Sequence, residues 1–443
     1  MIFIKSIYIH KTFFVYLGIA SACFLLSFWI KLLFPIAWII TIIIGVLFMT
    51  DLILLYSAKN RITARRILPD KFSNSDPNPV SITVANYYPF TIGLDIIDEL
   101  PVQFQKRDFS HTSNIKINGI YDFEYTVRPV ERGEYLFGNL NIYVSSQLRV
   151  IKRKYQFQKA QMVMVYPSFI QMQKYDFLAI GNHLTELGLK KIRRIGHTSE
   201  FEQIKEYVRG DDFRTINWKA TAKHAQLMVN QYQDEKSQPV YSIIDTGRVM
   251  KMPFNGLKLL DYAINATLAF SNVALKKQDK VGMLSFSKSI ETFLPAVHKL
   301  TYLNTILQNL YSINTRFSDS DYGLLYAQIK RKITHRSLFL LYTNFEHISG
   351  LKRQMPYLQA IAKKHLLVVI IFENTELDVL IQSKAEDLQA LYHKTIAEKF
   401  AFEKRLMLKE LQKHGIQSIL TTPEKLTIST INKYLEIKAR GLL

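Results

Sequence analysis

The sequence predicts a membrane-anchored multidomain protein with a two-helix transmembrane hairpin, a small antiparallel β unit and a doubly wound α/β domain. Residues 12–56 are almost continuously apolar, residues 80–167 contain short alternating runs, and strand-like and helix-like segments alternate after Gln238. A chain of 443 residues that is 48% hydrophobic can bury more than one core. The predicted boundaries are a transmembrane helical hairpin at 1–60, a linker at 61–79, an antiparallel β-sandwich-like domain at 80–167, a connector with a charged motif at 168–238 and the α/β domain at 239–443.

The apolar segment 12–56 contains two stretches separated by Lys31 and Pro35, and each is near the roughly 20 residues that cross a bilayer. A cleaved signal peptide has a shorter apolar core and is not followed directly by a second span. Basic residues flank the pair on both sides, so we expect both termini to be cytoplasmic, at the inner membrane of a bacterium. These flanking residues are Lys5, Lys11, Lys59, Arg61, Arg65 and Arg66.

The formal charge of +20 suits an anionic partner, either nucleic acid or the anionic face of a membrane. A basic cluster at residues 190–194 has no aromatic stacking pattern, zinc pattern or helix-turn-helix signal beside it, so we expect no specific nucleic-acid binding. Cys23 is the single cysteine, which excludes a disulfide framework and is compatible with a reducing compartment.

Short alternating runs such as 80–87 and 122–130 predict the antiparallel β unit, and Arg132-Gly133 predicts a hairpin turn within it. The α/β domain is predicted from alternating segments that imply a parallel sheet with helices on both faces. Its predicted strands are 239–245, 281–286, 289–294, 337–343 and 366–372, its predicted helices are 256–277, 302–313, 322–333, 351–364 and 383–414, and one more strand and helix follow to residue 437.

Asp245 ends the first of these strands, at the edge where open parallel sheets bind ligands. A first strand that ends in Asp resembles the von Willebrand factor A domain, whose Asp-x-Ser-x-Ser loop, a Thr and a second Asp bind a magnesium-like cation. Here Gly247 and Val249 stand at the serine positions and Asn344 at that of the second acid, so the site is degenerate. Either Mg²⁺ binds weakly or Asp245 is a hydrogen-bonded structural residue. The segment that could partly supply the threonine loop contains Asp319, Ser320 and Asp321.

The sequence contains no complete catalytic constellation. Ser285 and Ser287 lack a G-x-S-x-G elbow, the histidines lack a zinc-binding pattern, and no G-x-x-x-x-G-K-[ST] loop is present. We therefore expect no catalytic residue, no required cofactor and no enzymatic activity.

The stretch 206–223, EYVRGDDFRTINWKATAK, combines acids, several basic groups, a glycine and a tryptophan at close spacing, and we call it the hallmark motif. Gly210 permits a turn, Asp211 and Asp212 can cap it, and Arg209 and Arg214 are near enough in sequence to pair with these acids. An apolar set that includes Trp218 follows and is expected to anchor the loop. The motif is predicted to be an interaction or bracing element, and its further members are Asn217 and Lys219.

With these residues assembled, the chain resembles the bacterial domain-of-unknown-function family fifty-eight, membrane-anchored proteins with a von Willebrand A-like domain that are commonly encoded beside MoxR-type AAA+ ATPases. The hallmark motif is similar to the family signature nearly residue for residue, and the apolar hairpin, the turn at 128–138 and the loop after Asp245 occur in matching order. The resemblance implies a membrane-tethered adaptor that works with such an ATPase and with envelope proteins. The alternative is a metal-dependent membrane-bound hydrolase that acts on envelope material, and nothing in the sequence predicts the oligomeric state.

Overall fold

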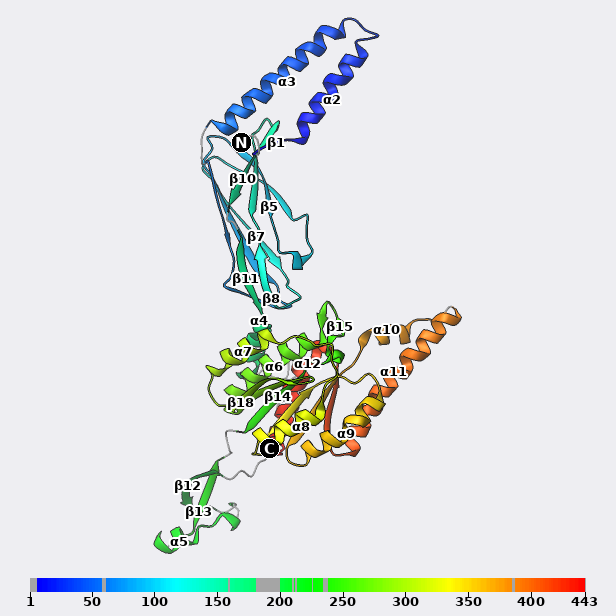
Figure 1. Ribbon diagram of the computed structural model, residues 1–443. Coiled ribbons are helices and arrows are strands. Elements are labelled where there is room, and N and C mark those ends of the chain that lie inside the picture. Colours follow the sequence, from blue (N-terminus) through cyan, green and yellow to red (C-terminus); the bar gives the residue numbers. More distant parts are fainter. Residues whose placement is uncertain are drawn as a thin grey trace. The chain divides into compact units, whose positions relative to one another are not determined.

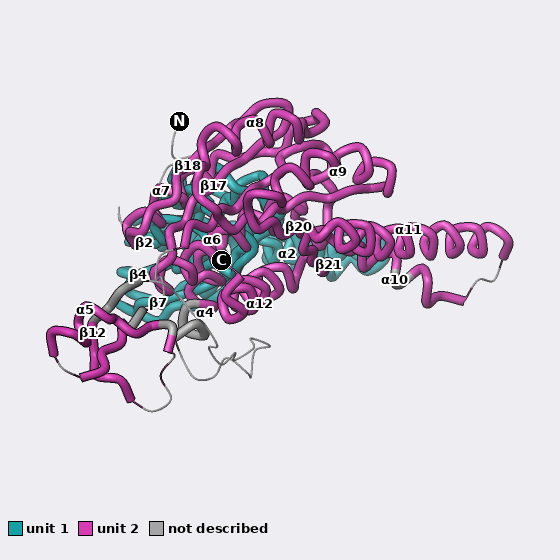
Figure 2. Tube along the Cα trace, turned by 90° about the horizontal axis from the view of Figure 1, so that it is seen from below, with its two compact units in different colours: residues 1–166 teal, residues 167–443 magenta. Residues whose placement is uncertain are grey.

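The computed structural model describes residues 6–57, 61–157, 160–180, 200–208, 211, 213–224, 226–233, 238–384 and 387–442. The chain divides into two compact units, Met1–Tyr166 and Pro167–Leu443, shown in different colours in Figure 2. Both helices and sheets are present in each unit. The predicted class is confirmed at this level, as a mixed α/β multidomain protein.

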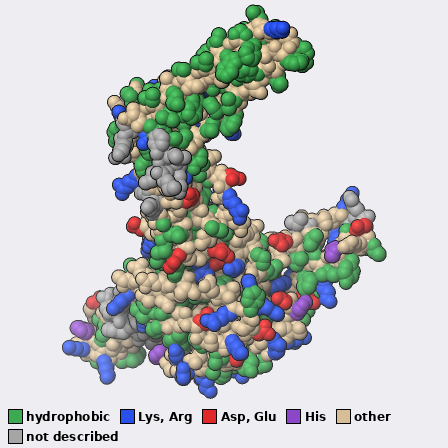
Figure 3. Space-filling view, turned by 45° about the horizontal axis from the view of Figure 1, so that its top comes forward, with side chains coloured by type: hydrophobic (Ala, Val, Ile, Leu, Met, Phe, Trp, Pro, Cys, Tyr) green, Lys and Arg blue, Asp and Glu red, His purple; other side chains and the backbone are tan. Residues whose placement is uncertain are grey.

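Two apolar helices, α2 (Lys11–Leu26) and α3 (Leu33–Tyr56), pack side by side in the N-terminal unit (Figure 1). The Phe24 ring of α2 lies 5.9 Å from the Trp38 ring of α3. Within the described ranges, α3 is the one helix that is long and apolar enough to cross a membrane, whereas α2 is a shorter apolar helix. Hydrophobic side chains cover much of the visible face of this pair (Figure 3), which indicates association with a membrane.

The β unit that follows the helices has three small sheets, in the orders β1-β10-β9-β5-β6, β2-β4-β7 and β3-β11-β8. All neighbouring strands are antiparallel except β3 and β11, and one hydrophobic core joins the three sheets. Burial alternates along β4 and β5, because successive side chains of a strand point to opposite faces. The strands are β1 (Ile7–Ile9), β2 (Ile62–Ile67), β3 (Lys71–Ser73), β4 (Asn78–Asn86), β5 (Ile92–Asp98), β6 (Ser110–Ile115), β7 (Ile120–Val127), β8 (Gly133–Phe137), β9 (Leu140–Ser145), β10 (Ile151–Phe157) and β11 (Gln161–Tyr166).

The segment predicted as a linker, 61–79, belongs to this β unit, because it contains β2, β3 and the start of β4. Its buried Asn78 donates through Nδ2 to Ser73 O at 2.9 Å and accepts from Ser73 N at 2.8 Å. The Asn- and Pro-rich composition therefore forms a turn inside the fold. Gly133 has a φ of 133°, but β7 and β8 lie in different sheets, so the predicted hairpin turn is a connection between sheets.

The end of α3 is built into the β unit. Asp51 is buried, and its Oδ2 accepts hydrogen bonds from Val150 N at 3.0 Å and Ile151 N at 2.8 Å. The Arg153 guanidinium lies 4.5 Å from the centre of the Tyr56 ring. One oxygen of a carboxylate that would be costly in hydrocarbon is therefore hydrogen-bonded by the backbone of the β unit.

The C-terminal unit is built on a six-stranded sheet among the described residues, in the order β18-β17-β14-β19-β20-β21. Five strands are parallel, and β18 at the edge is antiparallel to β17. The connection between β17 and β18 is too short for a parallel crossover, which explains this departure from the predicted parallel sheet. The strands are β14 (Pro239–Asp245), β17 (Lys280–Phe286), β18 (Ile290–Val297), β19 (Leu338–Tyr342), β20 (Leu366–Phe372) and β21 (Gln417–Thr421).

Helices cover both faces of this sheet, and each face has its own hydrophobic core. Along β20, Val368 and Ile370 pack on the side of α6, α7 and α12, whereas Val369 and Ile371 pack on the side of α8, α9 and α11. This arrangement is the one predicted from the nearly continuous apolar run of that strand. The helices are α4 (Phe169–Ile180), α6 (Leu259–Lys276), α7 (Tyr302–Ser312), α8 (Tyr322–Lys332), α9 (Ile348–Ala362), α10 (Thr375–Gln382), α11 (Leu388–Lys413) and α12 (Leu426–Ala439).

The hallmark motif lies in a separate small module of the C-terminal unit. Strands β12 (Glu200–Glu206) and β13 (Met228–Gln233) form an antiparallel pair. A 3-10 turn, η3 (Phe213–Thr215), and a short helix, α5 (Trp218–His224), occupy the connection between them. The predicted basic cluster at 190–194 lies outside the described residues.

Candidate functional site

Asp211 stabilises the turn that begins the hallmark motif. Its Oδ2 accepts from Val208 N at 3.0 Å, its Oδ1 pairs with Lys205 Nζ at 3.0 Å, and Asp211 N donates to Val208 O at 2.9 Å. The backbone hydrogen bond from Val208, followed by that from Lys205, lowers the pKa of the Asp211 carboxyl. The capping role predicted for Asp211 is therefore present, with Lys205 as its ion-pair partner. The other residues expected in this network, Arg209, Gly210, Asp212 and the side chain of Arg214, lie outside the described part of the chain.

Asn217 connects the short helix α5 to strand β13. Its Oδ1 accepts from Ala220 N at 3.1 Å, which caps α5, and its Nδ2 donates to Asn230 Oδ1 at 2.8 Å. Asn217 N also donates to Met228 O at 2.8 Å. These contacts hold the start of α5 against β13, and the bracing role of Asn217 stays a prediction.

Trp218 does not anchor the loop by burial, because 70% of its surface is exposed. Phe213, Val208 and Leu227 in the same module are 71%, 62% and 46% exposed. Tyr207 N donates to Leu227 O at 2.8 Å, which places Val208 and Leu227 at the same end of the strand pair. We call these four residues, Val208, Phe213, Trp218 and Leu227, the hallmark patch; the neighbouring Lys219 is also exposed. Sequence alone could not separate an anchoring tryptophan from an exposed one.

Asp245 lies at the carboxyl end of β14 and is completely buried. Its Oδ1 accepts from Ser320 Oγ and from Gly247 N at 2.8 Å. Its Oδ2 accepts from Thr343 Oγ1 at 2.7 Å and more weakly from Tyr322 OH at 3.4 Å. Burial raises the pKa of the Asp245 carboxyl above its ordinary value, and the hydrogen bonds from Ser320 and Thr343 oppose this rise. The carboxylate that would lead a metal site thus already has four donors among the described residues.

The other predicted metal ligands have partners of their own. Asp321 Oδ1 accepts from Leu324 N at 2.9 Å and caps α8, and Asp319 is exposed. Asn344 Oδ1 accepts from Lys404 Nζ. Within the described ranges, the structure brings together no group of three or more His, Cys, Asp and Glu side chains suited to a metal. The structure joins Asp245 to Ser320, and a hydrogen-bonded structural Asp245 in place of a metal ligand stays a prediction.

Two cavities lie at the carboxyl edge of the parallel sheet. One, of about 390 Å³, is lined by polar residues near Asp245, Ser320 and Asn344. The other, of about 340 Å³, is mainly apolar and also includes Asn344 together with Lys404 of α11. Sequence reasoning missed Lys404, although the signal was present. It occupies a position on the helical stripe that is otherwise apolar and buried, formed by Ala397, Met407 and Leu411.

Part of the C-terminal unit matches the model of a known protein family. Residues 203–382 match the model of the family described as "Protein of unknown function DUF58", which confirms the predicted resemblance. The "Uncharacterized protein YeaD" of Bacillus subtilis (strain 168) is 21% identical over 250 residues, which are 55% of this chain and 60% of that protein. The matched region thus spans about 60% of the length of this curated relative.

Two solved structures overlap 46% of the chain. "Conserved hypothetical protein BatB" from Bacteroides thetaiotaomicron is covered to 100%, with a TM-score of 0.31 and 16% identity. An "aerotolerance-related membrane protein" from Bacteroides fragilis NCTC 9343 is covered to 98%, with a TM-score of 0.30 and 13% identity. These TM-scores are too low to transfer a fold or a role.

Proposed function

We propose, from the match of residues 203–382 to the model of the DUF58 family, that the protein is a membrane-tethered, non-enzymatic interaction protein. The observation that carries the proposal is the hallmark patch, in which Phe213 and Trp218 are more than two thirds exposed. Exposed large apolar side chains that share one small module mark protein–protein contact surfaces, and Trp is enriched among the residues that dominate binding energy.

The backbone beneath the patch is held by polar contacts. Asp211 fixes the turn through Val208 and Lys205, and Asn217 fixes α5 against β13. A side chain presented from a fixed backbone loses less conformational entropy on binding. The acids and amides of the motif therefore support recognition by positioning, and the aromatic residues supply the contact area.

The remaining parts of the proposal concern location and architecture. We assign α2 and α3 to a two-span hairpin in the bacterial inner membrane with both termini cytoplasmic, supported by the flanking basic residues and the exposed apolar surface of the pair. We assign the six-stranded sheet to a von Willebrand A-like domain. Its support is the strand order, in which the first strand in sequence, β14, lies inside the sheet and the antiparallel β18 lies at one edge.

The partner implied by the family resemblance is a MoxR-type AAA+ ATPase, together with envelope proteins. The test is co-purification of the full chain from detergent extracts with that ATPase, compared among wild type, Trp218→Ala and Phe213→Ala. A residue that dominates an interface contributes at least about 2 kcal/mol, so each variant should bind the ATPase roughly 30-fold more weakly. The amount of ATPase recovered with each variant should fall accordingly.

The matched control is Phe402→Ala on α11, because Phe402 is 65% exposed, close to the 71% of Phe213, and lies outside the hallmark motif. We expect Phe402→Ala to retain the ATPase. Equal recovery by all four proteins would remove the hallmark patch as the contact surface, and failure of wild type to retain the ATPase would remove the partner.

A further inference from the structure

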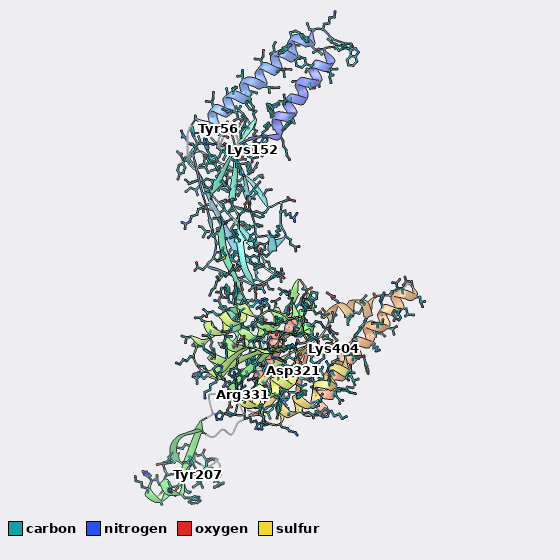
Figure 4. All side chains as sticks on the ribbon, in the orientation of Figure 1. Tyr56, Lys152, Tyr207, Asp321, Arg331 and Lys404 are labelled. Carbon is teal, nitrogen blue, oxygen red and sulfur yellow. The ribbon has the colours of Figure 1, made fainter. Side chains whose placement is uncertain are left out.

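The mainly apolar cavity at the sheet edge contains a buried amine. The cavity has a volume of about 340 Å³ and lies beside the carboxyl ends of β19 and β20, where parallel sheets bind ligands. Six of its fourteen lining residues are polar, and one of them is Lys404 of α11, which is labelled in Figure 4. The apolar side chains that line it are Met252, Pro253, Phe254, Leu259, Phe372, Leu377, Phe400 and Ala401.

Two neutral oxygens position the Lys404 amine. Among the described residues, Nζ donates to Asn344 Oδ1 and to Phe345 O, the latter at 2.6 Å. Asn344 is itself 6% exposed, so its carbonyl oxygen is fixed in place. A neutral amine has two hydrogens and one lone pair. Two acceptors can be served by the hydrogens of either form, and they fix the position of Nζ beside Asn344, which lines the cavity.

The surroundings of Lys404 increase the fraction of the amine that is neutral. Desolvation lowers the pKa of Lys404 to about 8, although the negative charge of Glu346 opposes the shift. Glu373 and His347 line the same cavity, and His347 Nδ1 lies 3.3 Å from Glu403 Oε2. Glu346, His347 and Glu373 are thus the other ionisable side chains among the described residues that line the cavity.

We propose that this cavity binds a small apolar aldehyde or ketone and that Lys404 Nζ holds its carbonyl carbon as a reversible imine. A desolvated lysine in an apolar pocket is the form of amine that makes such adducts. The Nζ lone pair forms the bond to carbon, and the carbonyl oxygen leaves as water with the two protons that the amine loses. Hydrolysis reverses the step, so the site captures a ligand without turnover. This inference does not depend on the hallmark patch.

The experiment uses the purified full chain in detergent with hexanal as the probe and cyanoborohydride to reduce the imine to a stable secondary amine. Peptide mapping then gives the rate of modification at each lysine. At pH 7.5 a pKa of about 8 leaves roughly a quarter of the Lys404 amines neutral, about 200-fold more than for an ordinary lysine. After allowance for burial and lower intrinsic nucleophilicity, we expect Lys404 to react at least about tenfold faster than Lys399, an exposed lysine on the same helix.

Two further measurements separate a site from accidental reactivity. Hexanol has a similar apolar body without a carbonyl group, so it should slow labelling of Lys404 and leave Lys399 unchanged. Lys404→Arg should lose the fast phase, and the matched Lys399→Arg should keep it. Labelling of Lys404 no faster than that of Lys399, or insensitive to hexanol, overturns the proposal. Both results come from wild type, so they hold even if Lys404→Arg does not fold.

Discussion

Replacing Asp245 by alanine removes the acceptor at the centre of the carboxyl edge of the sheet. In the wild type, its two oxygens accept from Gly247 N, Ser320 Oγ, Thr343 Oγ1 and Tyr322 OH. After the change, Thr343 and Tyr322 keep the 2.7 Å hydrogen bond between their hydroxyl groups. The backbone N–H of Gly247 and the hydroxyl of Ser320 lose the acceptor described for them.

The magnitude follows from these two donors. An unsatisfied buried polar group costs about 1 to 3 kcal/mol. Gly247 is buried and Ser320 is half-buried, so about 2 to 6 kcal/mol is an upper range for the two groups. In the wild type, burying the Asp245 carboxylate costs desolvation free energy, and the variant no longer has this cost. The expected loss in the free energy of unfolding is therefore about 2 to 4 kcal/mol. Asp245→Asn keeps one acceptor oxygen and should lose less.

The assay is native-state hydrogen exchange of the full chain, followed in peptides from β14 and β19. Tryptophan fluorescence cannot report on this region, since the three tryptophans are Trp29, Trp38 and Trp218. A loss of 2 to 4 kcal/mol corresponds to exchange that is roughly 30- to 1,000-fold faster in these peptides. The matched control is Asp321→Ala, which removes only the cap of α8 and should cost about 1 kcal/mol.

The same assay tests the degenerate metal site. A ligand present at about 100 times its dissociation constant stabilises the folded state by about 2.7 kcal/mol. We expect millimolar Mg²⁺ to leave exchange in β14 unchanged, because the oxygens of Asp245 already accept from protein donors. Acceleration below about fivefold in Asp245→Ala, or protection of β14 by Mg²⁺ that this variant abolishes, would refute the reasoning.

Three further predictions concern charged groups elsewhere. Burial lowers the pKa of Lys404 from 10.5 to about 8, so between these pH values the unfolded chain binds more protons than the folded chain. The free energy of unfolding should therefore rise with pH across this window, by up to about 3 kcal/mol relative to Lys404→Met. Unfolding followed by circular dichroism measures this difference. Asp51→Ala leaves two buried N–H groups without their acceptor and should lower the melting temperature of the detergent-solubilised chain, with Asp51→Asn in between. Asp98→Ala leaves the buried Arg66 guanidinium without its counter-ion and should lower the free energy of unfolding of the β unit by about 3 to 5 kcal/mol in chemical denaturation. An unchanged free energy of unfolding would contradict the importance of this ion pair.

The α/β part of the fold was predictable because its signal is local. The strand β20 is a run of seven apolar residues between helical patterns, and such a run is typical of a strand covered on both faces. Pairings between distant segments carry no comparable signal. Strand β1 precedes the apolar helices in sequence and pairs with β10, with Ile9 opposite Ile151. The two apolar helices are therefore inserted in sequence between strands of one sheet. The linker prediction failed for the same reason, since β3 pairs with β11 far along the chain.

The candidate site shows the same limit at the level of single side chains. The capping hydrogen bonds of Asp211 and Asn217 join each side chain to a backbone N–H three residues away in the sequence. Such local contacts can be predicted from residue type and spacing. The exposure of Trp218 and the position of Lys404 depend on which face of a helix meets the rest of the fold. Periodicity can reveal the second case, because a lysine on an apolar stripe must bury its stem and find partners for its amine.

The carboxyl edge of the sheet has a charge distribution that disfavours a divalent cation. Asp245 is surrounded by donors, the second acid of the resembling metal site is the neutral Asn344, and the Lys404 amine donates to the amide oxygen that could have served as a ligand. A cation at this edge would have to break these hydrogen bonds and approach an amine that is protonated in most molecules at neutral pH. The amide oxygen of Asn344 is thus engaged by Lys404, whose amine lines a mainly apolar cavity. Recognition by this edge is then expected to depend on the apolar body and the carbonyl group of a ligand, and the hallmark patch remains the surface for a protein partner.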